Sequence, residues 1–100
     1  MKSYFFAHSH ACPPEYAHRI LNDTAAIETW VSPFPYSAII VSKLNPHKLA
    51  AVLRQRLPNI WLLVTEMNSQ DVDGWLPGNL WEFVQNPAQA TSQQLLPISA

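Results

Sequence analysis

The stretch from Ser37 to Met67 constrains the fold of this chain most, because it has the pattern of a strand, a helix and a second strand. An apolar run at residues 38–41 (AIIV) opens the stretch, and a second run at residues 60–64 (IWLLV) closes it. Both runs are rich in β-branched or aromatic residues and are too short for buried helices, which favours strands. The stretch therefore predicts a βαβ unit.

The helix inside this unit has clear boundaries. Asn45 is a preferred N-cap, Pro46 suits the first helical position, and Pro58 ends the helix. The apolar residues between them recur on one helical face: Leu49, Ala50, Val52, Leu53 and Leu57. Because the two strands are apolar on both faces, we expect interior strands, or an edge strand whose open face is covered.

The remaining elements complete a fold prediction. We expect a strand at residues 3–8, a helix from Pro13 to Asn22, a strand at residues 25–31, a proline-containing hairpin loop at residues 32–35, and a short helix at residues 79–85. The order β-α-β-β-α-β fits an α+β fold, a ferredoxin-like split βαβ sandwich. In that fold two helices cover one face of a four-stranded antiparallel sheet with spatial order 4-1-3-2. A small three-layer α/β sheet is the alternative.

The chain of 100 residues has the length of one domain. We assign residues 1–86 to this α+β domain. Residues 87–100 carry no charge and are rich in Gln, Ser and Pro, which predicts a disordered or loosely tethered tail.

The composition predicts an apolar surface that a partner covers. Charged residues make up 13% of the chain, about half the usual share, whereas 48% of residues are hydrophobic and four are Trp. A domain of this size cannot hide so much apolar area in its own core. We therefore expect a homodimer, with a different protein as a second possible partner.

Charge and hydropathy bear on the other partner classes. A net charge of −1 and the separation of basic from aromatic residues argue against nucleic acid. No run of about 18 apolar residues is present, so no membrane span is expected. A single cysteine, Cys12, excludes an intrachain disulfide, which favours a reducing, cytoplasmic location.

Four aromatic residues are the predicted contact sites for a partner: Phe34, Trp75, Trp81 and Phe83. Phe34 is placed at the tip of the hairpin, exposed or folded back onto the local core. The short helix at residues 79–85 is apolar around most of its circumference. It must either cap the open face of the sheet or dock on a second subunit.

The sequence contains one concentration of chemically reactive residues, at His8, His10 and Cys12. On an extended strand His8 and His10 would share a face, as in some zinc sites. The Ser9-His10-Ala11 segment has the character of a turn, however, so we do not expect a metal site. Only two glycines are present, which excludes a glycine-rich phosphate loop, and no cofactor is expected.

These observations lead to two functional hypotheses. The favoured one is a small non-catalytic interaction or regulatory module that acts as a homo-oligomer. The alternative is a small metal-dependent hydrolase or nuclease that uses His8, His10 and Cys12 at the end of the first strand. Whether the protein is an enzyme stays open at this point, with the non-catalytic hypothesis preferred.

Overall fold

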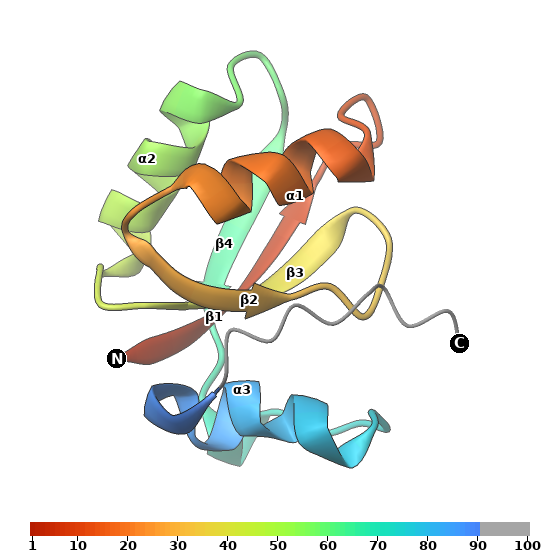
Figure 1. The fold of residues 1–100 in the computed structure, drawn as a ribbon, viewed down its shortest axis with the longest axis vertical. Coiled ribbons are helices and arrows are strands. Elements are labelled where there is room, and N and C mark those ends of the chain that lie inside the picture. Colours follow the sequence, from red (N-terminus) through yellow and green to blue (C-terminus); the bar gives the residue numbers. More distant parts are fainter. Residues whose placement is uncertain (91–100) are drawn as a thin grey trace.

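The computed structural model describes residues 1–90 and confirms the α+β, ferredoxin-like fold (Figure 1). The elements are β1 Lys2–His8, α1 Pro14–Asp23, β2 Ile27–Val31, β3 Ser37–Ser42, α2 Pro46–Arg56, β4 Leu62–Glu66 and a short C-terminal helix, α3 Glu82–Gln85. Three 3-10 turns accompany them, at Ser69–Asp71, Gly78–Trp81 and Pro87–Gln89. None of the helices in this part of the chain is long and apolar enough to cross a membrane.

The four strands form one sheet in the order β2-β3-β1-β4, as predicted. Each neighbouring pair is antiparallel. Since β3 and β4 both run antiparallel to β1, they are parallel to each other with β1 between them. The predicted strand-helix-strand unit is therefore a split βαβ unit, and β4 lies at one edge of the sheet.

The first core fills the space between the sheet and the two long helices (Figure 1). Tyr4 and Phe6 of β1 and Ile40 of β3 point into it and are fully buried. Leu49 and Leu53 supply the buried side of α2, and Asn45 caps that helix by accepting a hydrogen bond from the Lys48 N–H. These contacts explain why the apolar stripe of residues 46–57 fixes the helix on this face.

The second core lies on the other face of the sheet, under α3 (Figure 1). Val31, Ile39 and Val41 project from the strands and meet Leu80, Phe83 and Val84. The Ser3 hydroxyl donates a hydrogen bond to the Phe83 carbonyl, which ties β1 to this segment. Of the two alternatives for the short helix, the structure shows the first, in which it caps the sheet.

The strand predicted at residues 25–31 begins at Ile27, and its side-chain alternation is interrupted near this end. A strand without interruption would place Ile27 on the same face as Val31. The structure has a bulge between Ile27 and Thr29, so that Ile27 and Trp30 both pack in the first core. The extra residue of a bulge shifts the alternation by one position.

The strand predicted at residues 60–64 begins two residues later, at Leu62. The chain leaves α2 through Pro58 and reverses at Asn59, whose φ of 63° lies in the left-handed region that Asn tolerates well. Ile60 and Trp61 connect this turn to the start of β4. The predicted hydrophobic run is therefore only partly strand.

The predicted tail starts at residue 87, but its first residues pack onto the domain. Pro87–Gln89 form a 3-10 turn, and Ala90 contacts the second core. The rest of the predicted tail, residues 91–100, lies outside the described residues.

Candidate functional site

The four predicted contact residues do not form one surface. Phe83 is 2% exposed and belongs to the second core, and Trp81 packs partly buried beside it. Phe34 and Trp75 are 51% and 97% exposed, but they lie on separate loops, before β3 and before α3. Phe83 is thus occupied inside the domain, while Phe34 and Trp75 stay open to contact.

The structure separates Cys12 from the two histidines of the predicted reactive cluster. The rings of His8 and His10 both lie beside Tyr36, with centroid distances of 5.8 and 6.4 Å. Cys12 is 1% exposed, and burial raises the pKa of its thiol, which disfavours a reactive thiolate. Residues 9–12 form the predicted turn, closed by a hydrogen bond from the Cys12 N–H to the Ser9 carbonyl.

This arrangement leaves no metal site in the part of the chain that the structure describes. Within residues 1–90, no three His, Cys, Asp or Glu side chains lie in a group that could hold a metal ion. The Cys12 thiol is buried, whereas the imidazoles of His8 and His10 both lie beside Tyr36. The geometry gives the hydrolase alternative no support.

The surface that the structure does bring together lies at β4, and the sequence analysis missed it. Trp61 is 86% exposed and Leu63 is 66% exposed, next to each other on the same face of the strand. A signal was present in the sequence, because the predicted order 4-1-3-2 already places this strand at an edge. An edge strand that is apolar on both faces leaves one apolar face without a helix to cover it.

The backbone of β4 also offers hydrogen-bonding groups that have no partner among residues 1–90. The Ser9 N–H donates to the Trp61 carbonyl, and the Met67 N–H donates to the Ser3 carbonyl. With the antiparallel register of β1 and β4, residues 61, 63, 65 and 67 therefore pair with β1. The N–H and C=O groups of Leu62, Val64 and Glu66 point to the free edge.

This edge lacks several of the features that usually protect edge strands from pairing, and its one charged residue is Glu66. The pairing of β4 with β1 is regular over its whole length, and the strand contains no Pro and no Lys. The other edge strand, β2, is interrupted by the bulge described above. A regular edge strand without Pro, Lys or a bulge can serve as a template for the addition of another strand.

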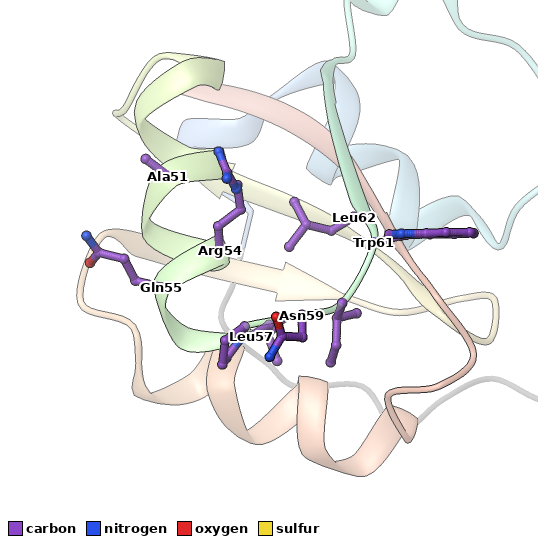
Figure 2. A pocket seen from close by; sticks show the side chains of 9 residues that line it. Ala51, Arg54, Gln55, Leu57, Asn59, Trp61 and Leu62 are labelled. Carbon is purple, nitrogen blue, oxygen red and sulfur yellow. The ribbon is translucent and has the colours of Figure 1, made fainter.

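A groove runs between α2 and β4, with a volume of about 910 Å³. Figure 2 shows Arg54 rising from α2 at this groove, with Leu62 pointing from β4 toward the helix and Trp61 pointing the opposite way. Further along β4, Arg54 also lines the space beside Val64 and Glu66. The Leu62 side chain thus borders the groove, whereas Leu63 and Trp61, which lines the end of the groove, project from the opposite face.

The groove is bordered by an unsatisfied positive charge. Arg54 makes no hydrogen bond or ion pair with any residue from 1 to 90, and α2 contains no acidic residue to neutralise it. Glu66 of β4 is paired with Lys2 at 3.4 Å, and both of those side chains are largely exposed. An exposed pair of this kind is weak and easily shared with another partner.

No protein-family model, curated protein or solved structure matches this chain.

Proposed function

We propose that the protein is a small non-catalytic interaction module that acts as a homo-oligomer, and that it associates through the free edge of β4. One observation carries this proposal: β4 presents the outward N–H and C=O groups of Leu62, Val64 and Glu66 beside the exposed side chains of Trp61 and Leu63. Backbone pairing and apolar burial would then be satisfied by the same contact.

The composition supports the same function. The excess of apolar over charged residues predicts a surface that needs cover, and the most exposed large hydrophobic residues include Trp61 and Leu63. Removing these side chains from water would supply the free energy that edge hydrogen bonds alone do not. With Cys12 as the single cysteine, the proposed setting is the reducing cytoplasm.

Light scattering of the purified chain tests the proposal. At tens of micromolar we expect a particle of about twice the chain mass of 11.3 kDa. Leu63→Lys should return the mass of one chain, because a lysine on the edge strand opposes strand addition. Trp75→Lys is the matched control, since Trp75 is exposed but lies outside β4, and it should keep the assembly. A wild-type particle of 11.3 kDa throughout would contradict the proposal.

A further inference from the structure

We propose that two copies pair their β4 strands antiparallel about a two-fold axis at Val64, so that Glu66 of each copy enters the α2–β4 groove of the other and pairs with Arg54. This inference rests on the proposed function and adds the register and the charge pair. The second copy therefore contributes a residue to the groove of the first.

The register follows from which backbone groups are free. Only Leu62, Val64 and Glu66 present their N–H and C=O groups at the edge, so a second strand can hydrogen-bond to these residues alone. Centring the two-fold axis on Val64 matches Leu62 with Glu66 of the other copy, and uses all three positions on both strands. Any other two-fold register shifts at least one of them beyond the strand Leu62–Glu66.

The same register covers the exposed apolar face. It sets Leu63 opposite Thr65 of the second copy, and Trp61 opposite Met67 of the second copy. Side chains directly opposite each other on antiparallel strands lie about 4.5–5.5 Å apart at Cβ, which is contact distance for these side chains. Trp61 and Leu63, the two large hydrophobic residues at this edge, would both gain neighbours.

On the face of β4 that borders the groove, the same register brings an acidic side chain of the second copy toward the basic Arg54. Glu66 of the second copy falls opposite Leu62, and Leu62 lines the groove together with Arg54. Among residues 1–90, Arg54 has no ion-pair partner, and the one ion pair of Glu66 is the exposed contact to Lys2. Two symmetry-related Arg54–Glu66 pairs therefore form without breaking a buried interaction.

The assembly closes at two copies. A two-fold contact uses the same edge on both chains, so that neither β4 is left free for a third. The remaining edge strand, β2, carries a bulge between Ile27 and Thr29, which interrupts regular pairing. A dimer with one continuous eight-stranded sheet is the expected product.

Reversing the charge of Arg54 or of Glu66 tests the proposed register. The quantity measured is the dissociation constant of the dimer, by sedimentation equilibrium on the full chain. Arg54→Glu and Glu66→Arg should each weaken the dimer about tenfold, because each places like charges at two symmetry-related positions. The double variant, Arg54→Glu with Glu66→Arg, should recover the wild-type constant within about threefold. Lys48→Glu is the control for the change in net charge, since Lys48 is exposed on α2 away from the groove, and it should have little effect.

The outcomes separate this inference from the proposed function. A wild-type protein that stays monomeric would overturn both. A wild-type dimer in which Arg54→Glu and Glu66→Arg act no more strongly than Lys48→Glu would overturn the register and leave the interaction module standing. Failure of the double variant to recover, with circular dichroism showing a folded chain, would also overturn the charge pair.

Discussion

At the scale of single residues, the stacking of His18 on Trp30 links the chemistry of a side chain to the stability of the fold. The two rings lie 4.8 Å apart, and the Trp30 Nε1–H donates a hydrogen bond of 2.9 Å to Asn22 Oδ1. Burial lowers the pKa of His18, the nearby Glu15 partly opposes this shift, and His8 adds to it. Folding therefore favours the neutral form of the His18 imidazole.

This shift predicts a stability that falls on mild acidification. The pKa of His18 in the unfolded chain is about 6.5, and the folded value is lower, so the unfolded chain binds the additional proton first. The contribution of His18 to the free energy of unfolding should be complete well above pH 6.5 and should decrease as the pH falls through that value. Urea unfolding between pH 7.5 and pH 5.5 measures it.

The control for this prediction is His18→Phe, which keeps a ring on Trp30 but cannot titrate. As the pH falls, the free energy of unfolding of the wild type should decrease more than that of His18→Phe. His10→Gln, at an exposed turn position, should follow the wild type. Parallel curves for the wild type and His18→Phe would contradict the role of His18.

At the scale of elements, α3 gives the sheet its second core. This helix has four residues and could not be stable alone, so its position depends on contacts with the sheet. Phe83 is 2% exposed against Val31, Ile39 and Val41, while Trp81 is only partly buried at the border of this cluster. Phe83 is therefore the largest buried side chain by which this segment packs on the sheet.

Removal of the Phe83 side chain should destabilise the fold. Phe83→Ala should lower the free energy of unfolding by about 3–5 kcal/mol, because it leaves a cavity between α3 and the sheet. Trp75→Ala, which removes a larger ring that is 97% exposed, should change it by less than about 0.5 kcal/mol. Chemical denaturation measures both variants. Equal effects of the two substitutions would show that the second core is not packed as described.

The elements also show how far the sequence alone can lead. Caps, prolines and apolar periodicity located both long helices and all four strands, because these signals act within a few neighbouring residues. The bulge at Ile27–Thr29 and the late start of β4 at Leu62 were not predictable in this way, since both depend on which residues of other strands lie opposite.

The candidate site also depends on contacts between distant segments, which the sequence alone does not show. The predicted contact residues were selected for aromatic character, which does not distinguish the buried Phe83 from the exposed Trp75. The β4 surface depends instead on topology, because a strand at the sheet edge exposes Leu63, whereas a strand between two others and under α3 buries Ile39. Arg54 could not be associated with β4 until the position of α2 over the sheet was known.

At the scale of the whole molecule, β4 is the proposed contact between two copies of the domain. One face of the sheet is covered by α1 and α2, and part of the other is covered by α3 (Figure 1). The edge formed by Leu62–Glu66 has no comparable cover from the described residues. Low overall charge, exposed Trp61 and Leu63, and the free backbone groups then have one common explanation.

Amide hydrogen exchange of β4 tests this central claim most directly. The N–H groups of Leu63 and Thr65 bond to β1 and should be protected at every protein concentration. The N–H of Val64 points away from β1, so that only a second strand can protect it. We predict slow exchange at Val64 at concentrations where the dimer forms, and faster exchange on dilution. Fast exchange at Val64 under all conditions, with Leu63 and Thr65 protected, would contradict pairing through this edge.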